Sequence, residues 1–205
     1  PKVLLGKREE TMPSFPGYWA FPGGGVSRVD NEAAETLGIE NRLVALFREM
    51  VEELGFTIQN DKINSVSDSI QARVISEKSA WFELAQTSAL PYNGNGIRLI
   101  SERTTPPFGP YRFANAFFHF HCVDEPPQIS LTQQTEFSEI QWIEPRYLLE
   151  QWNKHEIKVA PPVVTLLMEV ERCLNLMDGD MERVAADLEK RKPGRRSILF
   201  AHGGE

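Results

Sequence analysis

Between Asn41 and Leu54 the apolar positions recur at helical spacing, and this is the most regular segment of the chain. Large apolar residues fall on one face at about 100° per residue: Leu43, Leu46, Phe47, Met50 and Leu54. Gly55 follows them and is a typical helix-ending residue. The neighbouring arc carries Glu49, Glu52 and Glu53. We therefore predict a helix that packs one side on a core and holds charges on the other.

The rest of the chain mixes strand-like runs with further helical segments. Runs rich in β-forming residues predict strands at 3–9, 97–102, 113–123, 139–143 and 195–200. Helical spacing or helix-start signals predict helices at 65–88, 145–152, 161–177 and 180–191. Proline- and glycine-rich runs at 13–25 and 91–96 are predicted loops. No repeat or linker divides the chain, so we predict a single α/β domain over residues 1–205.

The composition, 41% hydrophobic and 25% charged residues, predicts a packed core. A net charge of −7 argues against a general nucleic-acid binder or a binder of anionic membranes. Cys122 and Cys173 are too few for a disulfide framework. No apolar run approaches the roughly 20 residues that span a bilayer. We expect a cytoplasmic protein with reduced thiols, and a homodimer is one option for its assembly. Because the first strand begins almost at once, we also expect residues upstream of Pro1.

The glutamates of the segment 41–54 need a chemical explanation. Glu49, Glu52 and Glu53 lie within an arc of roughly 100°, and like charges at this spacing destabilise a helix by about 0.2–0.5 kcal/mol per pair. Only Arg48 is near enough in sequence to relieve the repulsion. Clustered carboxylates are suitable ligands for Mg²⁺ or Mn²⁺. We therefore expect a divalent-metal site here, with a solvated acidic face as the alternative.

The stretch from Glu40 to Phe56 resembles the Nudix box, a glycine followed by the pattern Gx5Ex7REUxEExGU in which U is bulky and apolar. Glu40 is followed by seven residues and then by REMVEELGF, which matches the pattern throughout. Fifteen residues instead of five separate Gly24 from Glu40, so this alignment places an insertion of ten in the loop. We expect residues 25–39 to bulge from the fold near the active-site mouth, leaving Gly24 and the helix in their usual relation.

Further motifs resemble a subgroup, the peroxisomal coenzyme A diphosphatases. The shared features are an FPGG run at 21–24 followed by Asp30, then Thr105-Pro106, Arg112-Phe113, Phe117-Phe118, EFSEIQWIEPRYLL and IKVAPP. Ala114 and Asn115 stand where that subgroup usually has Asp and Thr. The resemblance covers roughly residues 3 to 175.

The resemblance implies a Nudix fold, an α/β/α sandwich around a mixed β-sheet. It also implies a helical insertion at about 60–90 and C-terminal helices at about 161–205. The implied activity is hydrolysis of a diphosphate joined to a nucleoside, with Mg²⁺ or Mn²⁺ as cofactor. Glu49, Glu52, Glu53 and the Gly24 carbonyl would bind the metal, and Arg48 would hold one glutamate by ion pairing. Glu40 would add a water-mediated ligand or only stabilise the helix N-terminus.

Other candidate site residues lie outside the box. Glu136, with Glu139 as its competitor, is the candidate for a further ligand or the general base. Arg112 and Trp19 are candidate substrate contacts, through phosphate binding and base stacking. Arg98 and Arg103 are equally suited to phosphate binding or to surface solubility, and His119 and His121 are interpreted as structural.

A small molecule is the expected partner, and its identity stays open. Coenzyme A or an acyl derivative is the first hypothesis for the substrate, and ADP-ribose or a nucleotide sugar is the alternative. A Nudix-fold module that binds a nucleotide without cleaving it is a second class of function, which the complete set of box carboxylates disfavours.

Overall fold

The structure is a computed structural model that describes residues 1–59, 62–92, 94–104, 114–122, 129 and 136–191. Predictions that fall on Arg112, on Thr105-Pro106 and on the strand at 195–200 lie outside these residues. In the described part of the chain, every helix is too short or too polar to cross a membrane.

The central sheet is mixed. Its strands, in spatial order, are β7 (Phe137–Ile143), β1 (Val3–Arg8), β2 (Tyr18–Ala20) and β8 (Lys158–Val159). β1 pairs antiparallel with both β7 and β2, whereas β8 runs parallel to β2. Two antiparallel ladders complete the strands: β3 (Phe56–Gln59) with β4 (Lys62–Ser65), and β5 (Arg98–Thr104) with β6 (Ala114–His119).

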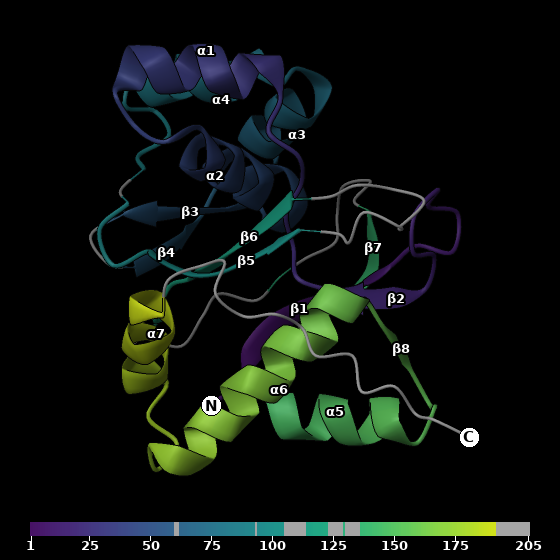
Figure 1. The fold of residues 1–205 in the computed structure, drawn as a ribbon. Helices are drawn as coiled ribbons and strands as arrows, with labels where there is room; N and C mark the ends of the chain where they lie inside the picture. The colour runs from purple at the N-terminus through teal and green to yellow at the C-terminus, as the bar shows by residue number, and fades with distance from the viewer. Residues whose placement is uncertain (60–61, 93, 105–113, 123–128, 130–135, 192–205) are drawn as a thin grey trace.

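Helices cover the strands from two sides (Figure 1). The first group is α1 (Arg28–Leu37), α2 (Asn41–Leu54), α3 (Asp68–Ser76) and α4 (Ser79–Gln86). The second group is α5 (Pro145–Asn153), α6 (Pro161–Leu176) and α7 (Met181–Lys190). This arrangement confirms the predicted α/β class and its mixed sheet.

Residues 25–39 differ from the bulging loop that the sequence predicted, because most of them form α1. A capping box starts this helix: the Ser27 hydroxyl accepts from the Asp30 amide at 3.2 Å, and the Asp30 carboxylate accepts from the Ser27 amide at 2.7 Å. Gly38, with φ 67°, ends it. Ala33 and Ala34 are buried in the core cluster that includes α2, so the insertion is a packed layer of the fold.

The core of the first helix group is built around α2. Val44, Phe47 and Val51 are buried there, and the Phe47 ring stacks on Trp81 of α4 at a centroid distance of 6.2 Å. The structure divides the predicted helical segment 65–88 into two helices, α3 and α4, whose apolar faces cover α2. The short strands β2, β3, β4 and β8 were not predicted from the sequence.

Candidate active site

Arg48 lies at the centre of a buried charge network on α2. Its Nε and Nη2 donate to the two carboxylate oxygens of Asp30 at 2.8 and 3.0 Å. Its Nη1 lies 2.8 Å from Glu49 Oε1 and 2.9 Å from Glu52 Oε2. The Arg48 side chain is 0% exposed, and its ion pairs hold the acids around it. We call Asp30, Arg48, Glu49 and Glu52 the Arg48 network.

The charges of this network stabilise one another. Burial alone lowers the pKa of Arg48, but the hydrogen bond to Asp30 and the charges of Glu49 and Glu52 outweigh it and leave that pKa raised. Burial alone raises the pKa of Asp30, but hydrogen bonds from Arg48 and Ser27 leave it lowered. Both groups are therefore charged at neutral pH.

This geometry shows how the charges of the glutamate arc are balanced. Arg48 pairs with both Glu49 and Glu52, where the sequence predicted an ion pair with one glutamate. Glu40 is exposed and pairs with Arg42, outside the Arg48 network. Asp30 follows Gly24 after five residues, the spacing of the motif, and the ten extra residues therefore lie between Asp30 and Arg48.

The Gly23–Gly24 turn lies directly against the glutamates of α2. The amide of Gly23 donates to Glu53 Oε2 at 2.7 Å. A Cβ atom on Gly24 would lie 2.1 Å from Glu49 Oε1, so no larger residue fits there without displacing that carboxylate. The expected relation between Gly24 and the helix is therefore present, although α1 intervenes in the sequence.

Glu49 and Glu53 are the acids that burial affects most. Burial and then the charge of Glu49 raise the pKa of Glu53 to about 8, although the hydrogen bond from the Gly23 amide opposes the shift. Burial also raises the pKa of Glu49, against the opposing charge of Arg48. The burial of Glu49 and Glu53 disfavours the alternative interpretation of this side of α2 as a solvated acidic face.

Glu136 lies beside this cluster, at the start of β7, and its charge also raises the pKa of Glu53. Its carboxylate pairs with Arg8 of β1 at 3.1 Å and is half exposed. Arg8 was missed in the sequence analysis, because its partner is far away along the chain. Glu139, the competing candidate, instead accepts a hydrogen bond from Gln141 on the same strand.

Comparison with known proteins identifies the architecture. The chain is similar to the crystal structure of a NUDIX hydrolase from Alicyclobacillus acidocaldarius, with a TM-score of 0.68, 24% identity and 82% of each chain covered. The chain has the Nudix fold.

The sequence comparison points to the same group of proteins. Over 187 residues the chain is 30% identical to "Putative nudix hydrolase 7" of Caenorhabditis elegans, a match that includes 88% of this chain. It spans 58% of that relative's length. No protein-family model matches the chain. Together the sequence match and the fold support the Nudix hydrolase family.

Nudix hydrolases generally use divalent metals, and the donor set of this site fits such an ion. Among the described residues, no three His, Cys, Asp or Glu side chains are already gathered in a metal-binding geometry. Arg48 occupies the space between Glu49 and Glu52. Glu52 Oε1, however, is buried and has no hydrogen-bond partner in the described part of the chain. A buried carboxylate oxygen without a donor is a ligand suited to a hard cation.

The remaining candidates lie away from the cluster or outside the described residues. Trp19 is 7% exposed and packs in the core with Leu5 and Ile143, so the proposed stacking on a base is corrected to a core role. Arg98 and Arg103 pair with Glu189 and Glu169 of the C-terminal helices. Arg112, the other expected substrate contact, lies outside the described residues.

Proposed function

We propose that this protein is a divalent-metal-dependent hydrolase that cleaves the diphosphate of a nucleoside-diphosphate-linked compound. The observation that carries the proposal is the convergence of Glu49 and Glu53 on the Gly23–Gly24 turn, next to Glu52, whose Oε1 has no partner in the described residues. Such an arrangement offers carboxyl oxygens and little else to a ligand. A cation must therefore stand between these oxygens and an anionic diphosphate.

Each residue has a distinct role in this proposal. Glu49, Glu52, Glu53 and the Gly24 carbonyl would hold Mg²⁺ or Mn²⁺. The bound ion would supply charge neutralisation at the diphosphate and a water that ionises near neutral pH. Arg48 fixes Glu49 and Glu52 from within the protein, where water does not compete. Glu136, half exposed and next to Glu53, would accept the proton of the attacking water.

Coenzyme A or an acyl derivative is the substrate that we propose first. The support is the resemblance of the FPGG run and of residues 136–149 and 157–162 to coenzyme A diphosphatases. The products would be adenosine 3′,5′-bisphosphate and the phosphopantetheine half. ADP-ribose and nucleotide sugars present the same diphosphate to the same acids, so contacts with the flanking groups decide between these substrates.

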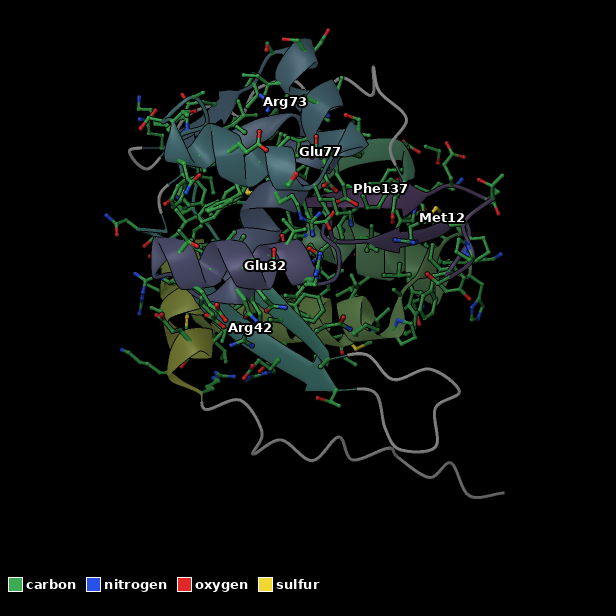
Figure 2. All side chains as sticks on the ribbon, turned by 90° about the horizontal axis from the view of Figure 1, so that it is seen from above. Met12, Glu32, Arg42, Arg73, Glu77 and Phe137 are labelled. Atoms are coloured by element: carbon green, nitrogen blue, oxygen red, sulfur yellow. The ribbon has the colours of Figure 1, made fainter. Side chains whose placement is uncertain are left out.

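A hydrolysis screen tests both parts of the proposal. Purified protein with Mg²⁺ or Mn²⁺ is incubated with coenzyme A, acyl-coenzyme A, ADP-ribose, nucleotide sugars and dinucleoside polyphosphates, and the products are identified by mass spectrometry. We expect turnover that stops with EDTA and falls by about 1,000-fold in Glu53→Gln, while Glu32→Gln on α1 (Figure 2) is unchanged. Full turnover in excess EDTA contradicts the metal proposal. A kcat/KM for ADP-ribose about tenfold above that for coenzyme A, near 1.4 kcal/mol, excludes the coenzyme A assignment.

A further inference from the structure

Arg8 is held in one orientation by three contacts at the end of β1. Its Nε donates to the Ser14 carbonyl at 3.1 Å, and its Nη2 donates to the Ser14 hydroxyl at 3.4 Å. Its Nη1 lies 3.1 Å from Glu136 Oε2. The Arg8 side chain is mostly buried, whereas the Glu136 side chain is half exposed. The arginine is therefore a fixed anchor, and the glutamate is the group whose position depends on it.

An irregularity in the sheet brings these two side chains together. In the β1–β7 ladder Lys7 is opposite Glu139, but Arg8 is opposite Phe137, so Ser138 has no opposite residue. The Ser138 hydroxyl donates to the Lys7 carbonyl at 3.1 Å within this bulge. Without the shift Arg8 would be opposite Ser138, one residue further from Glu136. Bulges of this kind redirect side chains and are frequent next to active sites.

The backbone beyond the bulge holds the start of β7 in place. The Glu9 amide donates to the Glu136 carbonyl at 2.9 Å, so the ladder continues past Arg8. This bond fixes the main chain of Glu136 but not its carboxylate. Among the described residues, Arg8 is the ion-pair partner of that carboxylate, and the charges of both residues act on Glu53.

We propose that Arg8 is a positioning residue that holds the Glu136 carboxylate beside Glu53, and that it influences hydrolysis mainly through Glu136. The inference rests on the proposed function, in which Glu136 accepts the proton of the attacking water. Nothing in it requires Arg8 to contact the substrate, because its Nε, Nη1 and Nη2 atoms are already bonded.

A double-mutant cycle on kcat tests this dependence. The proteins are wild type, Arg8→Gln, Glu136→Gln and the double variant, assayed with the screened compound that wild type hydrolyses best. We expect Glu136→Gln to lower kcat by about 100-fold and Arg8→Gln to lower it by about 10-fold, with KM unchanged within about twofold. The double variant should be no slower than Glu136→Gln alone, since the role of Arg8 disappears with Glu136. Arg8→Lys should recover part of the loss, and Lys7→Gln on the same strand should match wild type.

Two readouts that do not depend on turnover separate positioning from structural support. Mn²⁺ titrations of the metal-free protein, followed by electron paramagnetic resonance, should give the same affinity for Arg8→Gln as for wild type. Hydrogen exchange at the Glu9 amide should also be unchanged, because it reports the strand end itself. The inference is wrong if the two single losses in kcat multiply in the double variant. It is also wrong if Arg8→Gln speeds hydrogen exchange at the Glu9 amide and loses activity to a matching degree. Wild-type protein that hydrolyses none of the screened compounds refutes the proposed function instead.

Discussion

Two networks of arginine–carboxylate pairs join parts of the molecule, and they differ in burial and composition. The Arg48 network links α1 to α2 and its central guanidinium is 0% exposed. The second network, which we call the Glu169 network, links β5, α6 and α7. It consists of Arg103, Glu169, Asp187 and Arg191. The Arg103 side chain is 17% exposed there.

The net pKa shifts of Arg103 and Arg48 are opposite, although burial alone lowers the pKa of both. Burial lowers the pKa of Arg103, whose Nε is buried and has no partner among the described residues. It would lower that of Arg48 too, but the acids on several sides of Arg48 raise its pKa overall. A buried arginine is therefore charged in this fold where several acids surround it. Breaking such a pair should lower the free energy of unfolding more, the more deeply the pair is buried.

The largest effect is expected from Arg48→Met. The substitution keeps much of the side-chain volume but leaves the carboxylates of Asp30, Glu49 and Glu52 buried without their cation. We expect a loss of about 3–5 kcal/mol in the free energy of unfolding, measured by urea denaturation in EDTA at pH 7. Arg42→Gln, which removes a more exposed arginine from the same helix (Figure 2), should cost under about 1 kcal/mol. Equal losses in the two variants would contradict the role of burial.

A smaller loss is expected from Asp30→Asn, because the amide keeps one acceptor but loses the charge and the two-oxygen contact with Arg48. Hydrogen bonds to charged groups contribute about 1.5–3 kcal/mol, so we expect a destabilisation of about 2 kcal/mol. Glu32→Gln on the exposed face of the same helix is the matched control and should lie within about 0.5 kcal/mol of wild type. The same urea denaturation measures both, and an Asp30→Asn protein as stable as the control would show that α1 does not secure Arg48.

The contribution of Asp30 should also depend on pH in a defined direction. Its pKa is lower in the folded protein than its ordinary value of 3.8, so the unfolded chain binds the proton first. Its stabilising contribution is complete above that value and is lost as the pH falls toward the folded pKa. Glu49 and Glu53 have raised pKa values, so their effect on the pH dependence of the unfolding free energy has the opposite sign. Both acids are present in wild type and in Asp30→Asn, so the difference in unfolding free energy between these two proteins isolates Asp30. Unfolding free energies in EDTA between pH 6 and pH 2 should show this difference shrinking below about pH 4.

The sequence predicted those parts of the fold whose pattern is local. α2, α5 and α6 have long apolar stripes or clear start signals, and the structure confirms them within a few residues. α1 was missed because its buried residues are Asp30, Ala33 and Ala34, which give a weak apolar periodicity. β8 has two residues and exists only because β2 lies beside it, so no pattern within the segment could reveal it.

The residues of the candidate site likewise include some that a local sequence pattern reveals and others that depend on distant parts of the chain. The glutamates of α2 were found from their spacing along one helix. Asp30 could have been found as well, since it follows Gly24 at the motif's spacing and Ser27 at the spacing of a capping box. The contact between Arg8 and Glu136 could not, because it depends on the register shift between β1 and β7.

In the Glu169 network we expect a modest effect from Arg103→Gln. Its guanidinium donates to Glu169 at 3.0 Å, and burial already disfavours its charge. Arg191 also pairs with Glu169, so the acid keeps a cation when Arg103 is removed. We expect a loss of about 0.5–1 kcal/mol in unfolding free energy. A loss as large as that of Arg48→Met would mean that the Arg48 network does not stabilise the fold more than the Glu169 network does.

The smallest effect should come from Arg73→Gln, which removes the exposed pair between α3 and α4. The Arg73 and Glu83 side chains are 50% and 54% exposed, so water screens their attraction and holding both side chains in place costs conformational entropy. Arg73 is labelled in Figure 2. We expect a change within about 0.5 kcal/mol of wild type by urea denaturation, and a change reduced further in 1 M NaCl. Arg73 and Arg48 both form arginine–carboxylate pairs, so the ratio of their losses in unfolding free energy measures what burial adds to such a pair. A large loss for Arg73→Gln would contradict the claim that the buried pairs contribute more than the exposed ones.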